Sequence, residues 1–173
     1  MMRFLKFIFF LLSVFVIIFL VSLLLPSRVT ILKYVEVNAP LRNVEKQVVD
    51  FENWKNWYPA FKDENITVIK NTPGKGVLSS VTLKDMSGKS VNLNLIDTIQ
   101  HMINIQLETS SSTKVNYQFV LVRKVNGETQ LTWNVNINLG WMPWKKIQGI
   151  FMDKFSGQQY QSALDNLKKA AEN

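Results

Sequence analysis

The sequence predicts an α+β fold in which a curved antiparallel sheet of about six or seven strands wraps a long C-terminal helix, preceded by one N-terminal transmembrane helix. Three observations predict this arrangement. Nineteen residues from Phe7 to Leu25 are apolar except for two serines. The middle of the chain alternates apolar and polar residues, as strands with one buried face do. The final segment carries apolar residues at helical spacing, as a helix packed on one side does.

The apolar run at the N-terminus predicts a membrane anchor. As a helix it spans roughly 28 Å, about the hydrocarbon thickness of a bilayer. Arg3 and Lys6 precede it and the first acidic residue is Glu36, so the N-terminus is expected in the cytoplasm and the domain on the outer, periplasmic or extracytoplasmic, side. A cleaved signal peptide is the alternative, but bulky leucines stand where a cleavage site needs small side chains. We therefore predict a signal anchor over residues 1–28 and one domain over residues 29–173.

The domain is expected to open with one strand and two short helices. Residues 29–37 are rich in β-branched side chains and end at an Asn-Ala-Pro turn, which predicts a strand and then a helix start. Apolar residues recur at helical spacing over residues 41–49, which predicts the first helix. A second helix is expected from Phe51 to Tyr58, because Pro59 limits it.

Antiparallel strands should follow. In the last of them Leu131, Trp133 and Val135 alternate with Thr and Asn residues, so one face is buried and the other is wet. Asn126-Gly127 before it predicts a hairpin with a type I′ turn. The predicted strands cover residues 77–84, 90–99, 102–109, 114–125 and 128–139.

Two apolar stripes on the C-terminal helix are expected to cover the buried face of the sheet. A five-residue step puts the stripes out of phase and Gly157 lies between them, so we expect a break or kink near Ser156. The first stripe contains Ile147, Ile150, Phe151 and Phe155, and the second contains Tyr160, Ala163, Leu164 and Leu167.

Composition excludes several classes of function. The net charge of +7 falls to +4 once Arg3, Lys6 and Arg28 beside the anchor are set aside. The other basic residues form no stripe with interleaved aromatics, so nucleic-acid binding is not expected. The absence of cysteine removes thiol nucleophiles, disulfides and Cys-type zinc sites. His101 is the only histidine and is expected in an exposed turn, so we predict neither a metal nor a cofactor.

No catalytic residue is predicted either. The chain has no Gly-x-Ser-x-Gly nucleophile elbow. Asp50 with Glu52, and Asp63 with Glu64, lie in the predicted helix–loop region, where helix caps and solvated loops are commoner than acid/base pairs. An acid/base role would need a buried carboxylate, and nothing in the sequence forces one. Asp97 on a strand is a slightly better candidate by the same argument.

The whole domain resembles one known family. The resemblance is carried by residues 37–40 (Val-Asn-Ala-Pro), 50–59 (Asp-Phe-Glu-Asn-Trp-Lys-Asn-Trp-Tyr-Pro) and 127–133 (Gly-Glu-Thr-Gln-Leu-Thr-Trp), and by residues 149–155 with 164–169 at the end of the chain. These segments resemble the START-like, or SRPBCC, superfamily of polyketide cyclases/dehydrases and lipid transport proteins. The ending is similar to that of its membrane-anchored bacterial members. The resemblance implies a helix-grip fold.

The resemblance also implies a hydrophobic cavity between sheet and helix, with no shared set of catalytic residues. We therefore expect a membrane-tethered module that binds a lipid or another hydrophobic small molecule, rather than an enzyme. The candidate cavity residues are Trp54, Trp57, Tyr58, Leu93, Tyr117, Phe119, Trp133, Val135, Phe151 and Phe155.

Two other interpretations stay open. An enzyme acting on a polyketide-like substrate would need a polar residue in the cavity, for which Tyr117, Asn104, Thr82 and Asp97 are the candidates. An interaction protein would instead have its cavity filled by side chains. A second aromatic cluster, Trp141 and Trp144 next to two lysines, has the composition of a membrane-interface contact.

Overall fold

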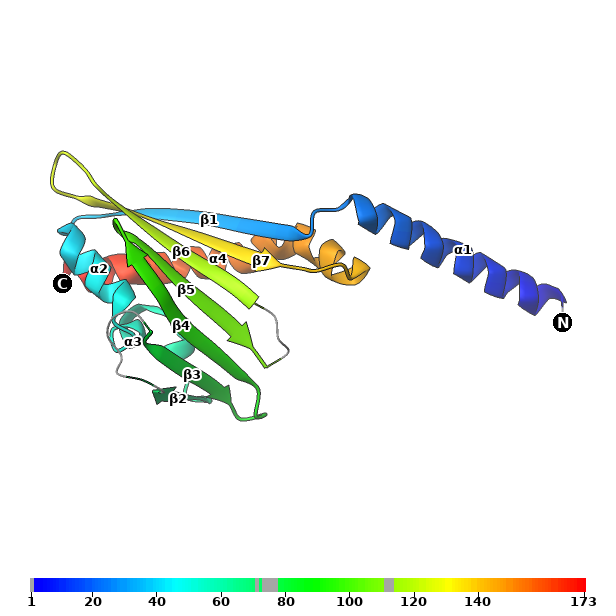
Figure 1. The fold of residues 1–173 in the computed structure, drawn as a ribbon, viewed down its shortest axis with the longest axis horizontal. Coiled ribbons are helices and arrows are strands. Elements are labelled where there is room, and N and C mark those ends of the chain that lie inside the picture. The colour runs from blue at the N-terminus through cyan, green and yellow to red at the C-terminus, as the bar shows by residue number, and fades with distance from the viewer. Residues whose placement is uncertain (1, 71, 73–77, 111–113) are drawn as a thin grey trace.

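A computed structural model of the chain describes residues 2–70, 72, 78–110 and 114–173. The apolar helix projects from one end of the domain, and the long terminal helix runs along the sheet (Figure 1). The elements are α1 (Met2–Leu24), β1 (Arg28–Val37), α2 (Leu41–Val49), α3 (Trp54–Trp57), the 3-10 helix η1 (Pro59–Phe61), β2 (Ile66–Lys70), β3 (Ser80–Asp85), β4 (Ser90–Ile99), β5 (Met102–Thr109), β6 (Lys114–Arg123), β7 (Thr129–Asn138) and α4 (Pro143–Glu172).

The predicted α+β helix-grip fold is confirmed. The strands form one seven-stranded antiparallel sheet in the order β1-β7-β6-β5-β4-β3-β2. Leu131, Trp133 and Val135 of β7 are buried, because alternate side chains of a strand share one face. Amide side chains occupy the outer face, where Asn134 donates to Gln118 and Gln118 donates to Asn104.

One turn and one strand differ from the sequence-based expectations. At Asn126-Gly127 only Gly127 has a positive φ, of 87°, and its N–H donates to the Lys124 carbonyl. This is a type I turn followed by a left-handed glycine, not a type I′ turn. The two consecutive positive-φ residues of a hairpin are instead Gln100 and His101. Strand β2 is absent from the predicted strands, because it is a short edge strand without alternating burial.

Three expectations fall wholly or partly outside the described residues. The sequence also predicts turns at residues 73–76 and 110–112, of which the first lies wholly and the second partly outside the described residues. The third expectation is the strand at residues 77–84, of which residue 77 lies outside them.

The two tryptophans of α3 bind α3 to the end of α2. Trp54 Nε1 donates to the Val48 carbonyl at 2.8 Å, and Trp57 Nε1 donates to the Gln47 carbonyl at 3.0 Å. Both carbonyls belong to the last turn of α2, where backbone carbonyls have no hydrogen-bond partners within the helix. Both rings are fully buried and pack edge-on against Phe119. The aromatic run at residues 51–61 is therefore largely core.

Helix α4 packs along β1 through small residues, and this corrects one expectation. Gly149 and Gly157 are buried, and an added Cβ would meet Leu139 at the first position and Lys33 at the second. The stripe Ile147, Ile150, Phe151 and Phe155, expected against the sheet, is exposed instead. The expected break is also absent, since α4 continues from Pro143 to Glu172. The second stripe behaves as predicted, with Ala163, Leu164 and Leu167 buried.

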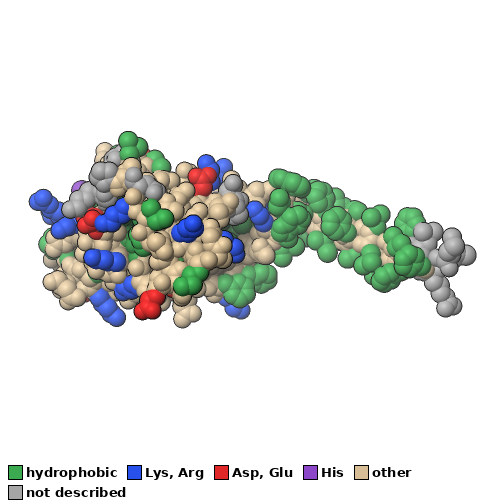
Figure 2. Space-filling view, turned by 90° about the horizontal axis from the view of Figure 1, so that it is seen from below, with side chains coloured by type: hydrophobic (Ala, Val, Ile, Leu, Met, Phe, Trp, Pro, Cys, Tyr) green, Lys and Arg blue, Asp and Glu red, His purple; other side chains and the backbone are tan. Residues whose placement is uncertain are grey.

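Helix α1 contains the one candidate membrane span among the described residues, Lys6–Leu24. Its side chains are almost all exposed in the isolated chain (Figure 2). At its C-terminal end the Lys146 ammonium, from the first turns of α4, donates to the Ser22 carbonyl at 3.2 Å. Both residues are buried. The Ser22 carbonyl also accepts the Leu25 N–H at 3.2 Å, and a lysine at a helix C-terminus complements the helix dipole. The structure thus joins α1 to α4 directly.

Candidate ligand-binding site

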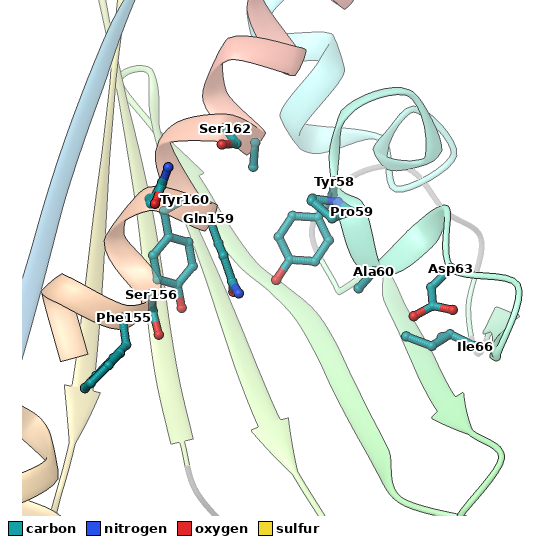
Figure 3. A pocket seen from close by; sticks show the side chains of 12 residues that line it. Tyr58, Pro59, Ala60, Asp63, Ile66, Phe155, Ser156, Gln159, Tyr160 and Ser162 are labelled. Carbon is teal, nitrogen blue, oxygen red and sulfur yellow. The ribbon is translucent and has the colours of Figure 1, made fainter. Parts of the chain in front are cut away.

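The main candidate site is an open pocket of about 680 Å³ between α4 and the segment from α3 to β2. One wall is helical and includes Phe155, Gln159 and Ala163. The opposite wall is formed by η1, the following loop and the start of β2, with Ala60 and Ile66 (Figure 3). The full lining is Tyr58, Pro59, Ala60, Asp63, Ile66, Phe155, Ser156, Gln158, Gln159, Tyr160, Ser162 and Ala163. Its size and mixed lining suit an amphiphilic small molecule.

A second space of about 630 Å³ adjoins the first. Both are lined by Tyr58, Ala60 and Ile66, and the second continues over Leu83, Val91 and Leu107 at the far end of the sheet. The lining of the second space is more apolar than that of the first. Its polar residues are Asp85, Lys89, Tyr58, Ser90, Thr109 and Ser110. Together the two spaces could accept an elongated apolar chain.

Three tyrosines meet at the inner end of the main pocket. The hydroxyls of Tyr58 and Tyr117 lie 3.2 Å apart, and the ring of Tyr160 packs edge-on against that of Tyr117 with centroids 6.1 Å apart. Burial raises the pKa of Tyr58 to about 12 and raises the pKa of Tyr117 and of Tyr160 as well. All three side chains are therefore neutral at physiological pH and act as hydrogen-bonding groups rather than as bases.

This cluster should make the protein sensitive to alkali. Unfolded tyrosines ionise near pH 10, whereas the raised pKa values keep these three neutral in the folded state. Stability is therefore full below pH 10 and should fall by about 1 kcal/mol per pH unit, per such tyrosine, as the pH rises towards 12. Denaturant titrations of the full chain between pH 8 and 11.5 measure this. Tyr58→Phe should flatten the decline, and an unchanged decline in that variant would contradict the prediction.

The structure separates the ten predicted cavity residues into four groups. Tyr58 and Phe155 line the main pocket. Phe151 is exposed and does not line it. Tyr117 lies behind Tyr58, hydrogen-bonded to it. The remaining residues are buried in packed core rather than in a cavity wall: Trp54, Trp57, Leu93, Phe119, Trp133 and Val135.

Of the four polar residues considered for an enzyme, only Tyr117 lies on the inner face. Asn104 donates to Asp97 on the outer face, and Thr82 donates to Asn92 there. His101 is exposed in the β4–β5 turn, 3.8 Å from Glu45. No group of three or more His, Asp or Glu residues in the described part of the chain could hold a metal ion.

Several pocket residues were missed from the sequence, among them Ala60, Ile66, Gln159 and Ser162. Ala60 lies in the short 3-10 helix η1 and Ile66 begins the edge strand β2. Gln159 and Ser162 lie on the exposed side of α4. None of these positions belongs to a periodic apolar pattern in the sequence. The sequence predicts Asp63 in a solvated loop. Asp63 does accept from the Asn65 N–H, and it also lines the pocket.

Comparisons with known proteins agree with this architecture. The profile of a family described as polyketide cyclase / dehydrase and lipid transport matches residues 28–172. The Zhui aromatase/cyclase from Streptomyces sp. R1128 superposes with a TM-score of 0.62 at 15% identity, over 84% of this chain and 94% of that one.

Two further solved structures share the fold. A START superfamily protein from Mycobacterium smegmatis gives a TM-score of 0.58 at 21% identity, covering 83% of this chain and 94% of its own. A protein from Chromobacterium violaceum gives 0.61 at 14% identity, with coverage of 86% and 99%. A search of curated protein sequences finds no match.

Proposed function

Because the chain belongs to the polyketide cyclase / dehydrase and lipid transport family, we propose that it is a membrane-tethered module that binds a lipid or another hydrophobic small molecule. The binding site is the pocket between α4 and the segment Tyr58–Ile66. The observation that carries the proposal is the paired open space of about 680 and 630 Å³ next to a solid core. The core fills the sheet centre, so the ligand occupies the space beside it.

The lining supports an amphiphilic ligand. Ile66, Leu83 and Leu107 offer apolar contact for a chain. Tyr160, Gln159 and Ser162 can hydrogen-bond a polar group at the other end. The tyrosine hydroxyls stay neutral, so the polar group need not carry a charge of either sign.

The apolar helix α1 supports a location at the membrane. In this proposal α1 remains uncleaved, with its N-terminus in the cytoplasm and residues 29–173 on the outer side, because Arg3 and Lys6 precede the span. Intact-mass measurement of the membrane fraction tests the anchor. Loss of about the first 25 residues would show a cleaved signal peptide instead.

Filling the pocket should abolish the ligand. Ala60 lines both spaces, so Ala60→Trp places a large ring where they join. Full chain purified in nanodiscs and extracted for mass spectrometry should carry one recurring hydrophobic compound. We expect Ala60→Trp to lower its occupancy by about tenfold or more, the equivalent of roughly 1.4 kcal/mol.

Ala170→Trp is the matched control, since Ala170 lies at the far end of α4 and lines neither space. Its occupancy should equal that of the unaltered chain. A chain consistently free of ligand, or equal occupancy in both variants, would contradict the proposed site.

A further inference from the structure

The first half of α4 exposes a continuous apolar stripe. Trp144, Ile147, Phe151 and Phe155 follow one another at steps of three, four and four residues, so they share one face of the helix. Their exposed fractions are 54%, 39%, 49% and 73%. The rings of Phe151 and Phe155 lie 6.4 Å apart. Side chains of this size rarely form an uncovered row on a soluble surface, so such a row indicates a binding surface.

The same face changes character further along α4. After Phe155 the positions at the same helical spacing are Gln158, Ser162, Asp165 and Lys169, all exposed. Only the half of α4 that adjoins α1 is apolar on its outer side. The partner that covers the apolar stripe is therefore expected near the end of the domain where α1 attaches.

Both ends of the stripe meet features already described. At one end Lys146 contacts the last turn of α1, and Trp141 and Trp144 are exposed beside it. At the other end Phe155 lines the pocket. Figure 2 shows hydrophobic side chains on the domain beside the base of α1. The stripe between these ends is roughly 17 Å long at 1.5 Å per residue.

The positive charges at the edges of the stripe favour phospholipid as the partner that covers it. Lys145 and Lys154 flank it, and the one acidic residue in this stretch, Asp153, is paired with Lys33 at 3.0 Å. Lysines beside Trp and Phe match a boundary between anionic headgroups and acyl chains.

We propose that bilayer phospholipid covers this stripe along its whole length and forms the path by which an acyl chain passes between the membrane and the pocket. The path rests on the proposed function, because it leads to the same pocket. The lipid contact itself does not, because Phe151 is outside the pocket lining.

Single cysteines test the contact cleanly, because the chain has none of its own. The variants Ile147→Cys, Phe151→Cys and Phe155→Cys, with Lys169→Cys as the control on the same face, are labelled with bimane in the full chain. They are reconstituted into vesicles of phosphatidylethanolamine and phosphatidylglycerol carrying nitroxide-labelled acyl chains. All three stripe labels should lose fluorescence by about twofold or more relative to the control, as groups at an acyl boundary do.

Quenching at position 147 alone would overturn the proposal, because lipid would then reach only the base of the domain. Lack of quenching, together with disulfide dimers of unlabelled Phe151→Cys, would assign the stripe to a second copy of the chain. Quenching at 151 in a protein that carries no extracted ligand would keep the lipid contact and refute the proposed function. Ligand in the pocket without quenching at 151 would keep the proposed function and refute the lipid contact.

Discussion

Replacing Trp133 with alanine is expected to lower the free energy of unfolding by about 3–5 kcal/mol. The Trp133 ring is fully buried. It stacks on Phe119 at 4.8 Å and meets Tyr117, Trp57 and Tyr160 edge-on at 5.0–6.0 Å. It is thus the point where the sheet, α3 and α4 come together. A domain of ordinary stability has about 5–15 kcal/mol in total, so the variant should be close to unfolding.

Trp141→Ala is the matched control for this loss. Trp141 is 70% exposed, so the same truncation should change stability by about 0.5 kcal/mol or less. Denaturant unfolding of the full chain in detergent, followed by circular dichroism, compares the two. Equal effects would show that the aromatic cluster is not the centre of the core.

Replacing Lys146 with methionine is expected to release α1 from the domain. The methionine retains most of the side-chain volume but cannot donate to the Ser22 carbonyl. A buried hydrogen bond from a charged donor contributes about 1.5–3 kcal/mol. The undocked population should therefore rise by about tenfold or more. Spin labels at Val14→Cys and Met86→Cys report this as a broader distance distribution between α1 and the domain.

The neighbouring lysine supplies the control. Lys145 carries the same charge but is only half-buried, and the structure gives its ammonium no contact with α1. Lys145→Met should leave the distance distribution narrow. A narrow distribution in Lys146→Met as well would show that α1 is held by other contacts.

Local pattern was sufficient to predict most of the fold. Residues 41–49 form α2 with the predicted bounds, because the helix has one apolar face and a proline before it. The alternation of Leu131, Trp133 and Val135 likewise fixed which face of β7 is buried. Strand β2 could not be found in this way. Four of its five residues are exposed, so its conformation depends on pairing with β3.

The site was harder to predict, because helical periodicity identifies a stripe but not the neighbour that covers it. Phe151 and Phe155 had the right spacing for a buried face, yet Gly149 and Gly157 take that place against β1. The two glycines were the available signal, since small residues let a helix approach a strand closely. Periodicity also does not distinguish a residue of the packed core from one that lines a cavity. Trp54 and Phe119 are apolar and central, but the pocket lies beside them.

The order of the strands has a consequence for biosynthesis. β1 pairs with β7, with Arg28 opposite Asn138. The first strand to be synthesised therefore cannot form its pairing until the last strand has been made. At about 5–20 residues per second the ribosome needs roughly 5–20 s to make the intervening chain. During that time β1 already follows the apolar helix α1, with its backbone hydrogen-bonding groups unpaired. The cell must protect this strand from aggregation until β7 arrives.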